Sequence, residues 1–332
     1  RSNFQQEIFE LYHDLIAFGT AGMLITTDDE DDLRFRTIHI AELFIAENQK
    51  GIVDTVIRRF HLKARALPGM FPDAEFPKDL QDMITEKPHE DVPILHAVMP
   101  NEMGGIYENN TNMAFTSCYV HKDTGFMLRE SGFKDFPYVV PRYLKASNEI
   151  YGRSPAMNAL PDVKMLNTMS KVTIKAAQKQ IDPPLMVPDD GFILPVRTVP
   201  GGLNFYRSGT RERIEPLNIG SNQPLGLQME EQRRKAIREN FFIDQLLSVQ
   251  GSNMTATEVM QKSEEKMRIL GPVLGRLQSE LLQPLITRCF NILLKNNKFA
   301  PPPEVLQAEQ IEIEYVSPIA KAQKSGDLSS IM

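Results

Sequence analysis

Hydrophobic residues near the start of the chain repeat at the spacing of one helix face. They stand three or four residues apart, and they are Phe4, Ile8, Leu11, Leu15 and Phe18. This spacing predicts an amphipathic helix. Gly19 and Gly22 then punctuate an extended apolar run, so we expect the helix to lead into a strand.

The segments that follow, up to about residue 150, mix strand-like and helix-like patterns. "LRFRTIHI" alternates as a strand does, and "PILHAVMP" is a strand candidate within a proline-rich stretch. "FTSCYVHKDTGFMLRESGF" predicts two strands joined by a tight hairpin at Lys122 to Gly125. By contrast, "AENQKGIVDTVIRRFHLKARAL" is expected to be helical after Gly51, and the acidic run at residues 28–32 to be a solvated loop rather than a metal site. Residues 1–150 therefore predict a mixed α and β body.

Two longer helices are predicted in the middle of the chain. The first begins at Pro155, where Ser154 suits the N-cap position and Pro161 is expected to kink the helix. The second spans about residues 225–247. Between them, residues 182–210 are rich in proline and glycine with short apolar pieces, which predicts a small β excursion. Together these segments predict a stalk with a tip, in which each helix spans roughly 35 to 40 Å.

A third long helix is predicted towards the end of the chain. Thr255 and Glu258 match a capping box, in which each side chain hydrogen-bonds to the backbone N–H of the other residue, so the helix is expected to start at about Ala256. Pro272 and Pro284 lie inside it. Each proline removes a backbone hydrogen bond and costs about 3 kcal/mol in an isolated helix. We therefore expect a kinked helix that is stabilised by packing of its apolar stripe, which consists of Met267, Leu270, Leu274, Leu277, Leu281 and Leu285.

Composition and charge narrow the classes of protein that fit. The 332 residues are 42% apolar and 24% charged, which is ordinary for a globular protein. No stretch has the roughly 18 to 20 apolar residues of a membrane span, and no signal peptide is evident, so we expect an intracellular protein. The net charge of −6 argues against a protein that holds nucleic acid through a broad basic face.

The common catalytic and metal-binding motifs are missing from the sequence. It has no phosphate-binding loop, no dinucleotide fingerprint, no zinc-protease motif and no nucleophile elbow. Two histidines have a carboxylate nearby in the sequence, and the two cysteines are isolated. For all of these residues a structural role is a better interpretation than metal ligation. These residues are His39 with Glu42, His89 with Glu90, Cys118 and Cys289. We expect no enzyme activity, no cofactor and no metal.

Two stretches of the chain resemble a known family. "NEIYGRSPAMNALPDVKMLN" and "SNMTATEVMQKSEEKMRILGPVLGRLQSELLQPLI" are similar to the portal proteins, or head-to-tail connectors, of short-tailed bacteriophages, and the order of parts fits over nearly the whole chain. The resemblance implies an α+β, helix-rich fold. Its parts would be an α/β wing at 1–150, a first stem helix at 151–182, a clip at 183–222, a second stem helix at 223–247, a tunnel loop at 248–255, a long kinked helix at 256–297, and a return strand to the wing with the start of a crown at 298–332.

The resemblance also implies a function and a set of partners. Portal proteins form a ring, usually a dodecamer, at one capsid vertex, and double-stranded DNA is packaged and ejected through the ring. The implied partners are further copies of the chain, the terminase ATPase, tail adaptor proteins, and capsid and scaffolding proteins, with no membrane involved. The implied location is the virion, and the host cytoplasm during assembly. Because the sequence shows no ATP site, the work of moving DNA would come from the ATPase.

The resemblance assigns the narrowest part of the channel to the tunnel loop, whose candidate residues are Gln250, Gly251, Ser252, Asn253, Met254 and Thr255. Lys171, Lys175 and Lys179 are four residues apart on one face of the first stem helix and are candidates for weak contact with DNA phosphates. A solvated helix face is the competing interpretation of this lysine row. Two other functions stay open: a helical scaffold or adaptor without a DNA channel, and, more remotely, a metal-dependent nuclease.

Overall fold

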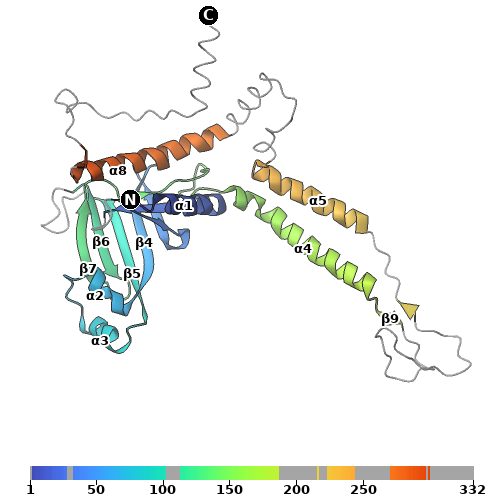
Figure 1. Ribbon diagram of the computed structural model, residues 1–332, viewed down its shortest axis with the longest axis horizontal. Helices are drawn as coiled ribbons and strands as arrows, with labels where there is room; N and C mark the ends of the chain where they lie inside the picture. The colour runs from blue at the N-terminus through green and yellow to red at the C-terminus, as the bar shows by residue number, and fades with distance from the viewer. Residues whose placement is uncertain are drawn as a thin grey trace, which may run out of the picture. The chain divides into compact units, whose positions relative to one another are not determined.

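The computed structural model describes residues 2–27, 33–101, 113–186, 215–216, 223–243, 270–296 and 298–299. The chain divides into two compact units, the first formed by residues 1–154 with 261–332 and the second by residues 155–260. Figure 1 shows the elements of each unit.

A five-stranded antiparallel sheet is the larger sheet of the first unit. Its strand order is β3-β4-β5-β6-β7. The strands are β3 (Leu43–Glu47), β4 (Val53–Lys63), β5 (Asp91–Pro100), β6 (Phe115–His121) and β7 (Met127–Phe133). The expected strands and hairpin at the end of this sheet are confirmed, and Gly125 in the hairpin has a positive φ of 69°, which glycine adopts without steric cost.

The helix expected after Gly51 is wrong, because this segment is strand β4. Alternate residues of the strand are buried, including Val56, Arg58 and Phe60. Arg58 occupies a core position and is 5% exposed, with its guanidinium 2.8 Å from a Glu42 carboxylate oxygen and 4.5 Å from the centre of the Phe60 ring. Because a charged residue occupies a buried position, apolar and polar residues do not alternate along β4. A hydrophobicity pattern therefore does not reveal the strand.

A second sheet of the first unit has three strands in the order β2-β1-β8. Helix α1 (Phe4–Phe18) leads into β1 (Gly22–Thr26) as expected, and the other strands are β2 (Arg34–Ile38) and β8 (Tyr138–Val139). Gly19 ends α1 with a φ of 77°. A Cβ at this position would lie 2.5 Å from the backbone of Arg153, so both the conformation and the close approach require glycine.

Side chains at the start of α1 form hydrogen bonds with backbone groups along the outer edge of β2. The Asn3 amide donates to the Phe35 carbonyl at 2.8 Å and accepts from the Phe35 N–H at 3.0 Å. The Glu7 carboxylate accepts from the Thr37 N–H at 2.5 Å. An open strand edge invites pairing with other chains, and these contacts occupy its backbone groups.

Short helices join the strands, and three clusters of buried side chains form the core of the unit. The short helices are η1 (Ile40–Glu42), η2 (Ala64–Ala66), α2 (Leu67–Met70) and α3 (Lys78–Glu86). One cluster lies under α2 and α3, one lies between the two sheets, and one joins α1 and β1 to the C-terminal helix. In the last cluster, Leu11 and Leu15 of α1 pack with Leu281, Leu285 and Ile292.

The C-terminal helix of the first unit contains a wide turn. Residues 270–277 are helical, η4 (Gln278–Leu282) is a π-helical turn, and α8 (Gln283–Lys295) follows. The Gln283 N–H donates to the carbonyl of Gln278, five residues earlier. In an α-helix the N–H of residue 284 would donate to the carbonyl of Glu280, but Pro284 has no N–H. The proline therefore accounts for a wide turn at this point.

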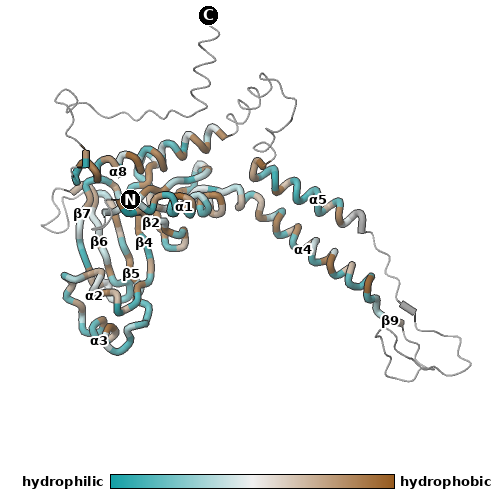
Figure 2. Tube along the Cα trace, viewed as in Figure 1, coloured by the Kyte–Doolittle hydropathy of each residue, from teal (hydrophilic) through white to brown (hydrophobic). Residues whose placement is uncertain are grey.

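The second unit is built on a helical hairpin. Helices α4 (Pro155–Ile181) and α5 (Gln223–Asn240) pack against each other, and β9 (Leu185–Met186) pairs antiparallel with β10 (Glu215–Pro216). Figure 2 shows polar and apolar bands alternating along α4. The second helix was expected to continue to residue 247, but α5 ends at Asn240 and Phe242 has a φ of 55°. The described helices and sheets confirm an α+β, helix-rich fold class.

Candidate functional site

Polar contacts hold α4 and α5 together at two levels. The Thr173 hydroxyl donates to Glu230 Oε1 at 2.7 Å, and Glu230 is 4% exposed. Further along the hairpin, Arg233 Nη1 lies 2.9 Å from Asp162 Oδ1. A residue late in α4 thus faces one early in α5, as two antiparallel helices require. These contacts fix which side of each helix faces the other.

The lysine row points away from α5. Successive residues of an α-helix are rotated by about 100°, so Lys171 and Lys175, each two residues from Thr173, lie on the opposite side of α4. Lys179 extends the same side, and all three side chains are exposed. Within the described residues, none of the three forms a salt bridge. The structure therefore gathers the expected lysines on one free face.

The basic residues of α5 are arranged differently, because carboxylates of the same hairpin engage most of them. Arg233 pairs with Asp162, Arg234 approaches Glu230 at 3.3 Å, and Lys235 lies 4.0 Å from Glu239. Among the described residues, salt bridges therefore engage the basic cluster of α5 and not the lysine row of α4.

The other expected site residues lie elsewhere. The tunnel-loop candidates at 250–255 and the cap residue Glu258 are outside the described residues. Pro272 is exposed in the helical segment 270–277, and Pro284 is the second residue of α8, one residue after the π-helical turn ends. The kinks assigned to these two prolines stay a prediction, although the wide turn beside Pro284 is a local departure from α-helical geometry.

A buried arginine that the sequence reasoning missed connects this turn to the β body. Arg142 is 1% exposed, and its Nε and Nη2 donate to the two carboxylate oxygens of Glu280 at 3.0 and 2.7 Å. Its backbone N–H donates to Glu280 Oε2 as well, at 3.0 Å. Glu47 and the carbonyls of Gly51 and Ile150 take the remaining guanidinium donors. The sequence signal for this buried arginine was its position as an isolated charge shortly after the apolar run at residues 138–140.

Electrostatics at this cluster favour its charged forms. Burial alone would lower the pKa of Arg142, but hydrogen bonds to Glu280 and Glu47 outweigh this effect and raise it. Burial alone would raise the pKa of Glu47, but hydrogen bonds from Lys145 and Arg142 lower it overall. Lys145 Nζ reaches both Glu47 oxygens, at 2.5 and 2.6 Å. The cluster is a connected and satisfied network of charges.

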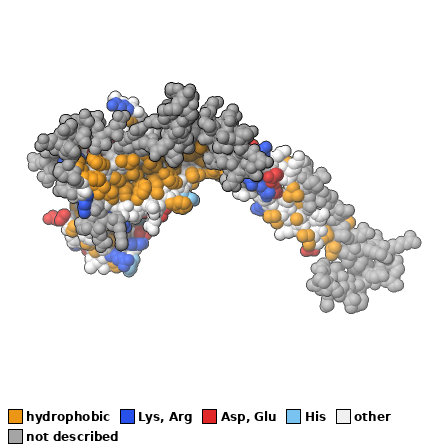
Figure 3. Space-filling view, turned by 45° about the horizontal axis from the view of Figure 1, so that its top comes forward, with side chains coloured by type: hydrophobic (Ala, Val, Ile, Leu, Met, Phe, Trp, Pro, Cys, Tyr) orange, Lys and Arg blue, Asp and Glu red, His pale blue; other side chains and the backbone are white. Residues whose placement is uncertain are grey.

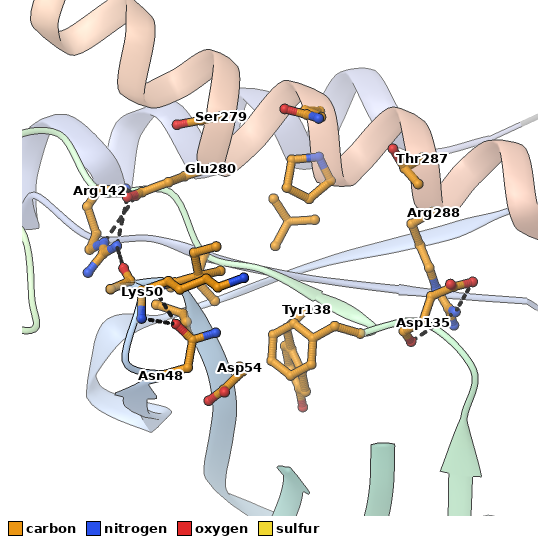
Figure 4. Close-up of a pocket in the computed structure, with 18 of the residues that line it drawn as sticks. Asn48, Lys50, Asp54, Asp135, Tyr138, Arg142, Ser279, Glu280, Thr287 and Arg288 are labelled. Atoms are coloured by element: carbon orange, nitrogen blue, oxygen red, sulfur yellow. Dashed lines mark hydrogen bonds and ion pairs between the residues drawn. The ribbon is translucent and has the colours of Figure 1, made fainter. Parts of the chain in front are cut away.

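A cavity of about 730 Å³ lies between the C-terminal helix and the sheets of the same unit (Figure 4). Arg142 with Glu280 stands at one end, and Arg288 with Asp135 stands at the other. Arg288 Nη1 donates to the Asp135 carbonyl at 3.2 Å, and burial lowers the pKa of Arg288. Two arginine contacts thus hold the helix to the body on either side of the cavity, with Pro284 among its lining residues.

In the part of the chain that the structure describes, no group of three or more potential metal ligands occurs. His39 Nδ1 accepts from the Ala41 N–H, whereas Glu42 is paired with Arg58. His96 is buried between Ser117 and Tyr138, with ring-nitrogen contacts of 3.0 and 2.7 Å. Desolvation lowers the pKa of His96 to about 3, so this ring is neutral and structural at ordinary pH.

Comparison with known proteins assigns the family. The sequence profile described as "Bacteriophage head to tail connecting protein" matches residues 1–332, the whole chain. This chain belongs to the bacteriophage head to tail connecting protein family. The family expected from sequence is therefore confirmed.

Curated proteins similar to this chain carry portal descriptions. The chain is 31% identical to the probable portal protein of Bordetella phage BPP-1 over 100% of this chain and 61% of the relative. It is 32% identical to the portal protein of Salmonella phage epsilon15, again over 100% of this chain and 61% of the relative. The portal protein of Enterobacteria phage T3 is 19% identical over 99% of this chain and 59% of the relative. The chain thus spans about three fifths of the length of the curated relatives it matches.

None of these descriptions names an enzymatic activity. Among the described residues, no helix of this connector-family chain is both long and apolar enough to cross a membrane.

Proposed function

We propose that this protein assembles into a ring-shaped channel at one capsid vertex, through which double-stranded DNA is packaged and ejected. The observation that carries the proposal is the match of the head to tail connecting family along the whole chain, together with portal descriptions for relatives at 31% and 32% identity. The α4–α5 hairpin supports it, because its free lysine row is suited to a polyanionic partner.

Each part of the chain takes a role in this proposal. Residues 1–150 form the wing, α4 and α5 belong to the two stem segments, and residues 183–222 form the clip. Residues 248–255 form the tunnel loop that lines the narrowest part of the channel. The helix that contains η4 and α8 is the long kinked helix, which the Arg142–Glu280 contact attaches to the wing.

The charge distribution suits a conduit better than a tight binding site. The chain carries a net charge of −6, so the wall of a ring repels DNA on average. The lysine row adds local positive charge, and lysine contacts to phosphates are weak, independent of base sequence and sensitive to salt. Weak contacts that do not depend on base sequence suit a duplex that must move through the channel.

The proposed partners follow from a position at the vertex. The clip would receive the terminase ATPase during packaging and the tail adaptor proteins afterwards, while the wing would meet capsid and scaffolding proteins. The protein would be part of the virion and would assemble in the host cytoplasm. No group of three or more potential metal ligands is found among the described residues, and the proposal involves no cofactor.

Imaging of the full-length protein tests the ring directly. We expect negative-stain micrographs of purified protein to show cyclic particles with a central hole, the dodecamer being the expected form. Particles without cyclic symmetry at concentrations where the protein is stable would contradict the channel and favour a helical scaffold or adaptor instead. Mass photometry of the same samples gives the number of copies independently.

A cross-link tests the position of the tunnel loop. Ser252→Cys, labelled with a photoactivatable thiol reagent in packaged particles, is expected to attach to DNA. Glu86→Cys, at an exposed position at the end of α3, serves as the control and is expected to remain unattached. Equal labelling of DNA from both positions, or from neither, would count against a channel lined by this loop.

A further inference from the structure

The α4–α5 hairpin has four sides of different character. Contacts to Asp162 and Thr173 define the side of α4 that faces α5. The lysine row occupies the opposite side. The remaining two sides lie about 90° to either side of Thr173 around the helix axis, and both carry exposed apolar residues.

The first of these sides, here called the first flank, contains Met165 and Val172. The second flank contains Ile174 and Ile181. Within each pair the residues are seven positions apart, the repeat that places side chains on one helix seam. Their exposed fractions are 44% and 61% on the first flank and 58% and 85% on the second. Figure 3 shows hydrophobic side chains at the surface along this hairpin.

Helix α5 extends this pattern. Leu227 and Met229 are 57% and 40% exposed, and helix geometry places them to either side of Glu230, which faces α4. The outward side of α5 is polar instead, with Gln228, Gln232, Lys235 and Glu239 exposed. Over residues 164–181 of α4 and along the outward side of α5, the hairpin is therefore polar on its outer faces and apolar on both flanks. Nearer the start of α4, Met157 and Leu160 are 47% and 46% exposed on the lysine side.

The hairpin itself cannot bury these flanks. Among the described side chains of α4, only Pro155 and Ala159 are buried, so α5 leaves both flanks open to a partner. A single partner on one flank would leave the opposite flank exposed to water. Copies arranged head to tail around a closed ring cover both flanks at once, because each copy presents its first flank on one side and its second flank on the other.

The charged and polar outer sides of the hairpin are unsuited to a contact between copies, so only the flanks remain for it. Two lysine rows facing each other would repel, and the outward face of α5 has little apolar surface to bury. We propose that the first flank of one copy packs against the second flank of the next copy. The inference rests on the proposed ring and assigns part of its subunit contact to four side chains: Met165, Val172, Ile174 and Ile181.

Paired cysteines test this arrangement in the full-length protein. Val172 and Ile174 lie at nearly the same height on opposite flanks, about 3 Å apart along the axis. With a flexible bis-maleimide, the double variant Val172→Cys/Ile174→Cys is expected to give a ladder of multimers on denaturing gels. Each single variant is expected to give none above the wild-type level, because each new thiol then meets a flank that lacks a new cysteine. The wild-type baseline measures any contribution of Cys118 and Cys289, and Lys175→Cys is the matched control on the lysine face.

Each outcome decides between arrangements. Dimers from either single variant, without higher multimers from the double variant, would show a symmetric contact and overturn the proposal. Absence of a ladder from a double variant that still forms rings on negative stain would also overturn it and leave the ring intact. Absence of rings from the wild-type protein would instead contradict the proposed function.

Charge substitution gives a second test that needs no cross-linker. Val172→Glu and Ile174→Lys are each expected to reduce ring yield about tenfold, since each buries an unpaired charge. The double variant is expected to recover most of the yield, because the two charges meet across the contact. Lys175→Glu, on the lysine face, is expected to leave ring yield near that of the wild type. A double variant no better than its single parents would contradict the pairing of unlike flanks.

Discussion

Arg142 holds Glu280 by both carboxylate oxygens across a sequence separation of 138 residues. Glu280 lies within the π-helical turn, and Arg142 follows the strand segment that enters the core of the first unit. The contact therefore fixes the wide turn of the C-terminal helix to the β body at the point where Pro284 prevents α-helical hydrogen bonding. Its geometry is that of a bidentate arginine–carboxylate pair, the strongest form of such contacts.

Removal of the Glu280 carboxylate is expected to destabilise the first unit. Glu280→Ala leaves the buried guanidinium of Arg142 without its bidentate partner, which costs about 2 to 4 kcal/mol of unfolding free energy. Urea unfolding of the full-length protein, followed by fluorescence and by circular dichroism, measures the change. The control Glu231→Ala removes an exposed carboxylate of α5 and is expected to change stability by less than about 1 kcal/mol. Similar losses for both variants would contradict the role of the buried pair.

Because His96 is buried in its neutral form, the folded protein is expected to lose stability in mild acid. Its pKa is lowered to about 3 in the fold from the ordinary value of 6.5, so below pH 6.5 the unfolded chain takes up a proton that the folded chain does not. Stability associated with the neutral ring is therefore full above pH 6.5 and falls as the pH drops towards about 3. The melting temperature of the wild type should decline between pH 7 and pH 5.

His96→Gln is expected to weaken this decline, although it also lowers stability at pH 7 through lost contacts with Ser117 and Tyr138. The measurement is the difference between the melting temperatures at pH 7 and pH 5 for each protein. His13→Gln, at an exposed position of α1, serves as the matched control and should retain the wild-type difference. An unchanged difference in the His96 variant would assign the acid sensitivity elsewhere.

Neutralisation of the lysine row is expected to alter DNA handling and to spare assembly. The triple variant Lys171→Gln/Lys175→Gln/Lys179→Gln removes three exposed charges that form no salt bridge among the described residues. Packaging velocity and DNA retention should change, with the largest effect at low salt, because the contacts are electrostatic. The control triple Lys122→Gln/Lys235→Gln/Arg238→Gln removes the same charge elsewhere. Unchanged velocity and retention in the lysine-row variant would support the solvated-face interpretation.

Asn3 is expected to protect the edge of β2. Asn3→Ala removes both hydrogen bonds to the Phe35 backbone, at a cost of about 1 to 3 kcal/mol. Amide hydrogen exchange at Phe35 should accelerate, and the protein should aggregate more readily as an open strand edge forms. Asn3→Asp keeps the acceptor for the Phe35 N–H and is expected to fall between the wild type and the alanine variant. Equal exchange in all three proteins would contradict the edge-cover role.

Local pattern was sufficient for several elements of the fold. The apolar spacing of α1, the Ser154-Pro155 start of α4 and the turn chemistry at residues 122–125 each depend on residues close in sequence, and the structure has a helix or hairpin at each place. The lysine row needed only the helical repeat to be assigned to one face of α4. The family resemblance supplied the fold class, which was confirmed.

Tertiary contacts decided the features that the sequence reasoning missed. Strand β4 escaped detection because Arg58 occupies a core position, which is stable only beside Glu42 from another segment. The partnership of Arg142 with Glu280 joins residues whose proximity no local pattern encodes. The sequence by itself determined which faces of each helix are polar or apolar, because the helical repeat is a local property. Only the tertiary structure decided that α5 takes the side of α4 containing Thr173 and leaves the lysine row free, because that choice depends on hydrogen bonds and burial between distant segments.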